Sequence, residues 1–307
     1  MTGWRAAVTF PGQGSQFPGM ADPWVAHEAG RTVLEAVSEA LGRDVVEGCR
    51  DEAALAETDF VQPALLACGL AAFRVLEAEG VTFLGAAGHS LGELTALVAA
   101  DALSLPDALQ IVLVRGRAMA EAGRARPGAM CALLGVGPEE AARLCEEVRD
   151  GDVLVVANEN SPQQVVLSGS LAAIERAERA AAERRIRAVR LKVAGAFHSP
   201  LMEPAVEPLG RAIDAATFRT PRIPVAENVT GELTTDPREL RELLKRQVVA
   251  PVRWDRCVRS LVEAGAELLV EAGPGDVLTR LAKRAAPGVR AVAVGAPEDA
   301  RELAAST

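Results

Sequence analysis

The sequence predicts an α/β protein in which a helix-covered parallel sheet is interrupted by a small ferredoxin-like domain. Short apolar runs alternate with helical patterns along most of the chain, as is typical of a parallel sheet with helices on its faces. Over residues 127–196 the order becomes strand–helix–strand–strand–helix–strand, which indicates a split βαβ unit. We therefore expect a discontinuous large domain, residues 1–126 and 197–307, that holds an inserted small domain, residues 127–196.

The first part of the chain contains two expected strands, each leading into a glycine-containing loop. Residues 6–10 are an apolar run that ends at Pro11-Gly12-Gln13-Gly14, and residues 83–87 lead into Gly88. Both patterns favour a buried strand followed by a turn. Helical periodicity predicts helices at 24–41, 62–79, 91–100 and 106–123. Pro63 would occupy the favoured first position of the second helix.

The small domain and the rest of the large domain follow in order. In the small domain we expect strands at 130–136, 153–157, 164–168 and 188–193, and helices at 138–148 and 171–184. After it we expect helices at 203–215, 236–249, 255–264 and 277–285, and strands at 223–227, 267–271 and 290–294. Ser90 precedes the insertion and His198 follows it, so a site that uses both would lie in the cleft between the domains, where ligands commonly bind.

Composition excludes several classes of function. Hydrophobic residues make up 49% of the 307 residues and the net charge is −9, as in an ordinary globular enzyme. No basic tract indicates nucleic acid, no apolar run has the length of a membrane span, and the first residues lack a signal-peptide layout. The five cysteines are scattered, without a C-x-x-C pair. We expect them to be small core residues in a cytoplasmic protein without a metal site.

The most informative motif is Gly88-His89-Ser90-Leu91-Gly92, a G-x-S-x-G pattern. This pattern is typical of a sharp strand-to-helix turn that presents a serine hydroxyl at the top of a sheet. The flanking glycines leave room for the tight backbone, and the following helix directs its N-terminal amides at the same point. A carbonyl attacked there would find oxyanion donors in place. We therefore expect Ser90 to be a nucleophile.

A serine nucleophile needs a base, and the chain has three histidines. His89 is adjacent to Ser90 on the turn and would point elsewhere, so we interpret it as a buried imidazole that braces the turn. His27 lies in a polar helical stretch and is interpreted as a surface residue. His198 lies where an expected strand runs into a loop, a usual place for active-site residues. By elimination, His198 is the expected general base.

Further motifs give the chain a family resemblance. They occur in this order: Phe10 to Gln16, Gln62-Pro63-Ala64, Gly88 to Glu93, Arg115-Gly116 with Met119, Asn158 to Pro162, Gly195 to Ser199, then Gln247 and the loop Glu271 to Gly275. This ordered set resembles the malonyl-CoA:acyl-carrier-protein transacylases and the closely related discrete acyltransferases of polyketide synthesis. The resemblance covers nearly the whole chain. It implies a hydrolase-like α/β domain with a ferredoxin-like insertion, in agreement with the order of elements above.

The resemblance also implies roles for individual residues. Ser90 would take the acyl group from CoA as an ester, and His198 would activate it. A backbone or amide carbonyl near Gln247 would orient the imidazole in place of an acid, since no Asp with a clear triad role stands out. The backbone N–H groups of Leu91 and Gln13 would be the oxyanion donors.

Arg115 is the implied partner of the free malonyl carboxylate. A guanidinium fork is a natural bidentate receptor for a carboxylate, and in a partly desolvated cleft it would select strongly against neutral acyl groups. The alternative is a surface arginine on an amphipathic helix, because Arg117, Arg124 and Arg126 are nearby and equally available.

Other residues implied to bind substrate have structural alternatives. Phe197 would narrow the pocket towards malonyl, or only pack in the core. Gln62 and Gln247 would contact substrate, and Gln62 could instead only cap its helix. Asn160, with Asn158, would line the CoA entrance or serve as a turn residue. Met119, one helical turn from Arg115, would be pocket wall or core.

The implied partners are malonyl-CoA and an acyl carrier protein, which brings its own phosphopantetheine, so no cofactor is expected. We expect a monomer. Carrier proteins are acidic, so this acidic enzyme would need a local basic patch. Two clusters are candidates: Arg184, Arg185, Arg187, Arg190 and Lys192, or Arg280, Lys283 and Arg284.

Two other functions use the same features differently. A serine hydrolase that clears acyl groups from carrier proteins would use water as acceptor, but it would not need a carboxylate clamp. A non-catalytic docking protein would need neither Ser90 nor His198. A related acyltransferase could also use another acyl unit.

Overall fold

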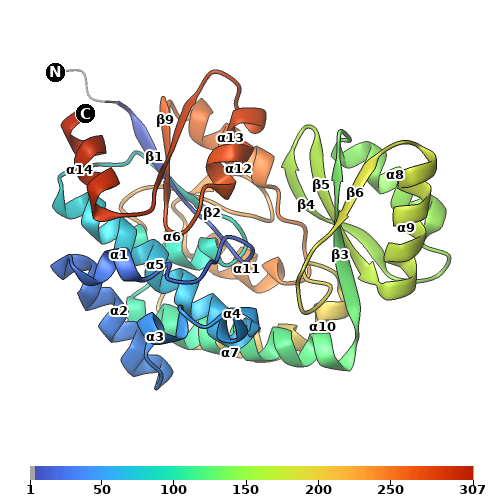
Figure 1. Cartoon of the computed structure of the whole chain (residues 1–307), viewed down its shortest axis with the longest axis horizontal. Helices are drawn as coiled ribbons and strands as arrows, with labels where there is room; N and C mark the ends of the chain where they lie inside the picture. The colour runs from blue at the N-terminus through green and yellow to red at the C-terminus, as the bar shows by residue number, and fades with distance from the viewer. Residues whose placement is uncertain (1–3, 307) are drawn as a thin grey trace.

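Two β-sheets organise the chain, which is described over residues 4–306 in the computed structural model (Figure 1). The six-stranded sheet has the order β10-β9-β1-β2-β7-β8. Its neighbouring strands are parallel except for β7 and β8, which are antiparallel. The four-stranded sheet has the order β4-β5-β3-β6, and all of its neighbours are antiparallel. The expectation of an α/β protein with a mostly parallel sheet is confirmed.

The strands and helices have the following bounds. The strands are β1 Ala6–Phe10, β2 Ala86–Gly88, β3 Gly128–Leu134, β4 Leu154–Ser161, β5 Gln164–Ser170, β6 Arg187–Arg190, β7 Val225–Ala226, β8 Leu233–Thr234, β9 Leu268–Ala272 and β10 Arg290–Val294. The helices are α1 Asp22–Val25, α2 Glu28–Leu41, α3 Val45–Gly48, α4 Glu52–Ala56, α5 Thr58–Ala78, α6 Gly92–Ala99, α7 Leu105–Ala125, α8 Pro138–Val148, α9 Leu171–Glu183, α10 Glu203–Ala215, α11 Pro237–Gln247, α12 Trp254–Glu263, α13 Val277–Ala285 and α14 Pro297–Ser306, with a 3₁₀ turn at Pro200–Met202.

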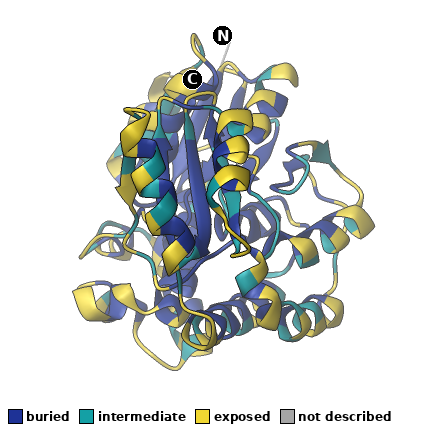
Figure 2. Ribbon diagram, turned by 90° about the vertical axis from the view of Figure 1, so that its right-hand side faces the viewer, coloured by how far each residue is buried: buried dark blue, intermediate teal, exposed yellow. Residues whose placement is uncertain are grey.

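The large sheet is covered on both faces, which explains its continuously apolar strands. All five residues of β1 are buried. Because successive side chains point to opposite faces, Val8 and Phe10 join the core formed with α2, α5, α6, α7 and α14. Ala7 joins the second core, formed with α12 and α13. Figure 2 shows buried residues along the strands and exposed residues on the outer sides of the helices.

The four-stranded sheet has one face covered by helices and the other directed at the large sheet and its helices. Leu133 and Leu167 pack with residues of α8 and α9. Met130, Ala132 and Val166 belong instead to the core cluster that includes Val8 and Phe10 of the large sheet. In Figure 1 the sheet therefore stands between its own helices, at the right, and the large domain. Its inner face forms one wall over the carboxyl end of β2.

Helix α5 corrects two expectations. It begins at Thr58 rather than Gln62, so Pro63 lies inside the helix and Gln62 does not cap it. It is also the one helix among residues 4–306 that is long and apolar enough to cross a membrane, although no apolar run of that length was expected. Of its most apolar window, 89% is buried within the fold, as in the core helix of a globular protein.

The expected helix over residues 24–41 is two helices, α1 and α2. The chain is extended at His27, whose imidazole Nδ1 accepts a hydrogen bond from the Ala29 amide at 3.3 Å. His27 is therefore the half-buried N-cap of α2, and its interpretation as a plain surface residue is wrong. An imidazole that accepts a free helical amide stabilises the start of a helix as other caps do.

Strand β4 is longer than expected, and this changes the place of two asparagines. It continues to Ser161 through two register shifts, so Asn158 and Asn160 lie on a strand and not in a turn. Strand β6 ends at Arg190, earlier than expected. Four short or terminal elements were not expected: α3, α4, β8 and α14. The five cysteines are buried and free, as expected.

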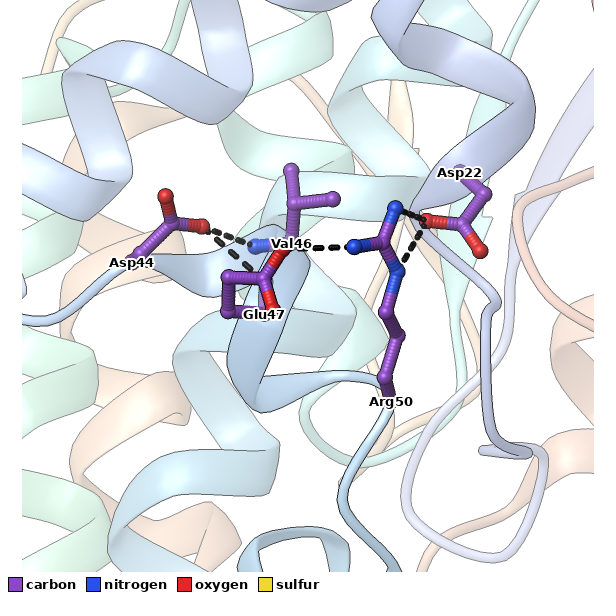
Figure 3. A network of polar contacts seen from close by, with 5 residues as sticks. All are labelled: Asp22, Asp44, Val46, Glu47 and Arg50. Atoms are coloured by element: carbon purple, nitrogen blue, oxygen red, sulfur yellow. Dashed lines mark hydrogen bonds and ion pairs between the residues drawn. The ribbon is translucent and has the colours of Figure 1, made fainter.

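The short helices near the N-terminus are joined by an exposed polar network (Figure 3). Asp44 caps α3 by accepting from the amides of Val46 and Glu47 at 2.8 and 3.0 Å. Arg50 donates to Asp22 at 3.0 Å and to Glu47 at 2.5 Å. We call Arg50, Asp22, Asp44 and Glu47 the Arg50 network.

Candidate active site

Ser90 lies on a tight turn between β2 and α6, at the carboxyl end of the large sheet. Its φ is 54°, a left-handed conformation that is costly for a residue with a side chain. The flanking glycines are required by close backbone contacts. A Cβ on Gly88 would lie 1.8 Å from the carbonyl carbon of Gly92, and one on Gly92 would lie 2.1 Å from the Phe10 oxygen. The motif therefore encodes the turn that presents the Ser90 hydroxyl.

The Ser90 hydroxyl is paired with His198. Ser90 Oγ lies 2.7 Å from His198 Nε2, although the two residues are 108 positions apart in the sequence. His198 Nδ1 lies 2.9 Å from the backbone oxygen of Gln247 and 3.2 Å from that of Ala250. A carbonyl oxygen only accepts, so Nδ1 carries the proton and Nε2 is free to accept the serine proton. A carbonyl thus occupies the position that an acid takes in a triad.

Burial keeps His198 neutral. The side chain is 3% exposed. Desolvation, and then the nearby charge of Arg115, lower the pKa of His198 to about 3. Its φ of 55° is again left-handed, so base and nucleophile are both held in strained conformations. A neutral imidazole with a free Nε2 is the state that a general base requires at pH 7.

Arg115 lies on α7 and points at the nucleophile from inside the protein. Its guanidinium donates to Ser90 Oγ at 3.0 Å and to the side-chain oxygens of Gln62 and Gln247 at 2.8 and 3.0 Å. It is 2% exposed, whereas Arg117, Arg124 and Arg126 are exposed. Burial lowers its pKa to about 10, so it remains a cation at neutral pH. The alternative of a surface arginine is therefore wrong.

Gln247 joins the three groups just described. Its backbone oxygen faces His198, and its side-chain oxygen accepts from Arg115. Its Nε2 donates to the Ser90 backbone oxygen at 2.9 Å. Neither Gln247 nor Gln62 is among the described residues that line the cleft. The structure places both behind Arg115, where they fix the guanidinium.

Asn228 contacts the Ser90 turn, and the sequence analysis missed this residue. It follows β7, and its side-chain oxygen accepts from the Ser90 amide at 2.7 Å. Its Nδ2 donates to the Gly88 oxygen at 2.7 Å. Asn228 therefore holds both sides of the turn. The available signal was its position, a polar residue directly after a buried parallel strand, where sites form in such sheets.

Two backbone amides beside Ser90 have no protein acceptor. Gln13 and Leu91 both line the cleft. Within residues 4–306, no hydrogen bond uses either amide as donor. Such amides are suited to bind the oxygen of a tetrahedral intermediate.

His89 joins the turn to β4 of the four-stranded sheet. Its Nε2 lies 2.9 Å from Asn160 Oδ1 and 3.3 Å from Asn158 Nδ2 on β4. Its ring packs 5.5 Å from that of Trp254. Burial lowers the pKa of His89, so it stays neutral. The expectation that it braces the turn is confirmed, and Asn160 both contacts it and lines the cleft.

The cleft between the two sheets has a volume of about 190 Å³. Ser90, His198 and Arg115 lie on its walls, together with Met119 and Phe197. Sites for drug-sized ligands are typically about 300–1,000 Å³, so this space suits a short acyl group rather than a whole nucleotide. A larger hollow of about 750 Å³ lies among α2, α5 and α7 and contains none of these residues.

Comparison with known proteins gives matches over nearly the whole chain. The acyl transferase domain family matches residues 8–300. The malonyl CoA-acyl carrier protein transacylase of Bacillus subtilis is 38% identical over 99% of this chain and 97% of its own. A solved malonyl-CoA:acyl carrier protein transacylase from Xanthomonas oryzae superposes with a TM-score of 0.94 at 40% identity, covering 99% of both chains. A malonyl-transacylase solved in complex with a type II PKS acyl-carrier protein superposes with a TM-score of 0.94 at 36% identity. The match covers 99% of this chain and 100% of that one.

Proposed function

Because the chain belongs to the acyl transferase family, we propose that it transfers a malonyl group from CoA to the phosphopantetheine thiol of an acyl carrier protein. One observation carries the proposal. A buried guanidinium lies 3.0 Å from a serine hydroxyl that is itself paired with a neutral histidine. A nucleophile and a carboxylate receptor at this distance suit an acyl group that ends in a carboxylate.

In the first half-reaction, Ser90 Oγ attacks the thioester carbonyl of malonyl-CoA and its proton passes to His198 Nε2. The amides of Gln13 and Leu91 stabilise the negative oxygen of the tetrahedral intermediate. The C–S bond then breaks, and His198 returns the proton to the sulfur of CoA. The product is a malonyl ester on Ser90 and free CoA.

In the second half-reaction, the thiol of the carrier protein gives its proton to His198 and attacks the ester carbonyl. The bond from carbon to Ser90 Oγ breaks, and His198 returns the proton to the serine. The chain thus alternates between a free and an acylated form, a ping-pong sequence. The hydrogen bond from His198 Nδ1 to the Gln247 carbonyl keeps the imidazole oriented throughout.

Substrate selection is assigned to Arg115 and Phe197. The malonyl carboxylate would replace Ser90 Oγ as a partner of the guanidinium, forming a charge-assisted pair in a desolvated site. An acetyl group has no carboxylate and would lack this charge-assisted pair, so it would bind more weakly. Phe197 is 6% exposed, and it lines the cleft directly before the base. It limits the space for a branched acyl group.

The carrier protein is proposed to dock at the mouth of the cleft. Leu191 and Val193 line one side of the cleft and α13 lines another, so Lys192 and the basic cluster of α13 lie next to it. Arg184, Arg190 and Arg280 are offset by Glu147, Glu178 and Asp276. Within residues 4–306, the exposed Lys192 and Lys283 have no ion pair, which leaves them for an acidic partner.

Four further features complete the proposal. Residues 127–196 form a ferredoxin-like insertion, which the sheet order β4-β5-β3-β6 with α8 and α9 on one face supports. The chain acts as a monomer in the cytoplasm. It needs no cofactor of its own, since the carrier protein supplies phosphopantetheine. The pathway served is either fatty-acid or polyketide synthesis.

Intact-protein mass spectrometry tests this function. The wild type and Ser90→Ala are incubated briefly with malonyl-CoA, acetyl-CoA or methylmalonyl-CoA. We expect a stable adduct of one malonyl unit on the wild type, no adduct on the variant, and little acetyl adduct. Adding a carrier protein should then remove the adduct and load the carrier. A preference for acetyl or a larger unit would favour a different acyltransferase, and loss of the adduct to water would favour a hydrolase.

A further inference from the structure

Two glutamates are buried side by side beneath the Ser90 turn. Glu93 lies in the first turn of α6, and Glu227 follows β7 directly before Asn228. Both are 0% exposed. Glu93 Oε2 accepts from the Asn228 amide at 2.8 Å. Within residues 4–306, no donor reaches Glu93 Oε1 or either side-chain oxygen of Glu227.

Two adjacent carboxylates that share a single donor, the Asn228 amide, would be strongly unfavourable in a buried site. If one of them is protonated, it becomes the missing donor and the other becomes its acceptor. One such hydrogen bond uses Glu93 Oε1 and the protonated oxygen of Glu227, so two of the three oxygens without a donor are accounted for. Protonation of one glutamate also halves the buried negative charge.

The surroundings decide which glutamate keeps the proton. Burial raises the pKa of Glu227 well above its ordinary value, and repulsion from Glu93 raises it further. Burial also raises the pKa of Glu93, but the contact with Glu227, the Asn228 amide and the charge of Arg115 all oppose that rise. Glu93 is thus the residue that carries the negative charge, and Glu227 is the residue that stays protonated.

The other ionisable groups around the pair are few. Arg115 faces Glu93 from α7, and Glu239 of α11 adds a more distant negative charge that favours a protonated Glu227. Cys257 of α12 donates to the Glu227 backbone oxygen at 3.5 Å. Burial and the two glutamates raise its pKa well above the ordinary value, so it stays a neutral thiol.

We propose that Glu227 is protonated at neutral pH and donates a hydrogen bond to the carboxylate of Glu93. The resulting acid–carboxylate pair positions the Ser90 turn. The single negative charge of the pair balances the buried Arg115. The pair holds the Asn228 amide, and the Asn228 side chain holds the Ser90 amide. Glu93 and Glu227 are thus positioning residues that act on the nucleophile through Asn228.

The first test is the thermal stability of Glu227→Gln against pH, with the exposed Glu263→Gln as the matched control. In the wild type, the folded pair keeps a proton that the unfolded chain releases near pH 4–5. The stability of the wild type therefore falls as the pH rises from about 4–5 through the raised pKa that Glu227 has in the folded protein. The amide of the introduced glutamine would donate to Glu93 at every pH. The Tm of Glu227→Gln should therefore rise relative to the Tm of the wild type as the pH increases from 5.5 to 9. Glu263→Gln should follow the wild type.

The second test separates positioning from mere packing, and it rests on the proposed role of Ser90. Glu227→Ala removes the donor, and we expect kcat for acyl-enzyme formation to fall about tenfold or more with little change in KM. Glu227→Gln should recover most of this loss and keep its activity to higher pH than the wild type does.

The outcomes are distinguishable from those of the proposed function. If the Tm curves of Glu227→Gln and wild type run parallel from pH 5.5 to 9, the shared proton does not exist, whatever the substrate. If the variants do not fold, infrared spectroscopy of the wild type at pH 7.5 must still show a protonated carboxyl band, and its absence overturns the proposal. Failure of malonyl-CoA to acylate Ser90 would refute the function alone, because the thermal and infrared tests use no substrate.

Discussion

Two polar networks in this protein use similar groups in opposite surroundings. The Ser90 cluster lies between the two sheets and consists of the half-buried Ser90 and four buried residues, His198, Arg115, Gln247 and Asn228. The Arg50 network of Figure 3 lies on the surface of the N-terminal helices, and Arg50 and its carboxylate partners remain exposed. Each joins a guanidinium to several oxygens at hydrogen-bond distance. The burial of these contacts decides what each network does.

The contacts of the two networks also differ in the sequence separation of the residues that they join. Gln247 and Ser90 are 157 positions apart, whereas Arg50 and Asp22 are 28 apart. In the buried cluster, each lost partner leaves a desolvated polar group, so every member is expected to matter. In the exposed network water replaces a lost partner, and such ion pairs contribute little. The structure thus predicts a steep gradient of mutational effects between the two regions.

The largest effect is expected for His198→Ala. Removing the base leaves no acceptor for the Ser90 proton, so kcat should fall roughly a thousandfold or more. The rate of acyl-enzyme formation in a rapid-quench assay measures this. His27→Ala, which removes a helix cap far from the cleft, should keep the wild-type rate. A fall of less than about tenfold in His198→Ala would assign the base to another group.

Asn228→Ala should have the next largest effect. It leaves the Ser90 amide and the Gly88 oxygen without partners, at about 1–3 kcal/mol for each buried group. We expect kcat/KM for malonyl-CoA to fall ten- to a hundredfold, on the order of the same energies. Thr230→Ala removes an exposed turn contact to the Glu232 amide and is the control. Equal kinetics in the two variants would show that Asn228 does not hold the turn.

The neutral state of His198 predicts a dependence of stability on pH. Its pKa is about 3 in the folded protein and near 6.5 when unfolded, so the unfolded chain binds the proton first. The contribution of His198 to stability should therefore be complete above pH 6.5 and fall as the pH decreases towards 3. His198→Gln should lose less stability than the wild type between pH 7 and 5, as measured by urea unfolding. A larger loss in His198→Gln would mean that the wild-type imidazole is already charged.

The smallest effect is expected for Arg50→Ala. This change removes the contacts to Asp22 and Glu47, and water solvates the freed carboxylates. The Tm should equal that of the wild type within the error of calorimetry, in low and in high salt. A clear fall in Tm would place the Arg50 network among the stabilising contacts of the N-terminal helices and weaken the contrast drawn here.

Sequence reasoning located the parts of the site that local chemistry encodes. The two glycines around Ser90 specify their turn locally, and His198 was found because the chain has three histidines. The lengths of α8, α10 and α13 follow from strong local signals such as proline near the first residue or a clear apolar period. In each case the determining residues are close together in the sequence.

The missed features depend on contacts between distant segments. Asn228, Glu93 and Glu227 meet only when β2, α6 and β7 are placed side by side. The position of Asn228 after a strand indicates a site there, but it does not identify the residues that Asn228 contacts. The asparagines of β4 look like turn residues, yet the contacts to His89 hold them on a strand. Helix α5 begins before Pro63 because its apolar surface is buried on all sides, which outweighs one lost backbone hydrogen bond.

The most direct test of the account is the preference for malonyl-CoA over acetyl-CoA in Arg115→Ala, with Arg117→Ala as the control. Arg117 lies two residues further along α7 and is exposed. We predict that Arg115→Ala lowers kcat/KM for malonyl-CoA on the order of a hundredfold or more and changes that for acetyl-CoA far less. Arg117→Ala should match the wild type with both substrates. An unchanged ratio of the two kcat/KM values in Arg115→Ala would contradict the assignment of the buried guanidinium to the malonyl carboxylate.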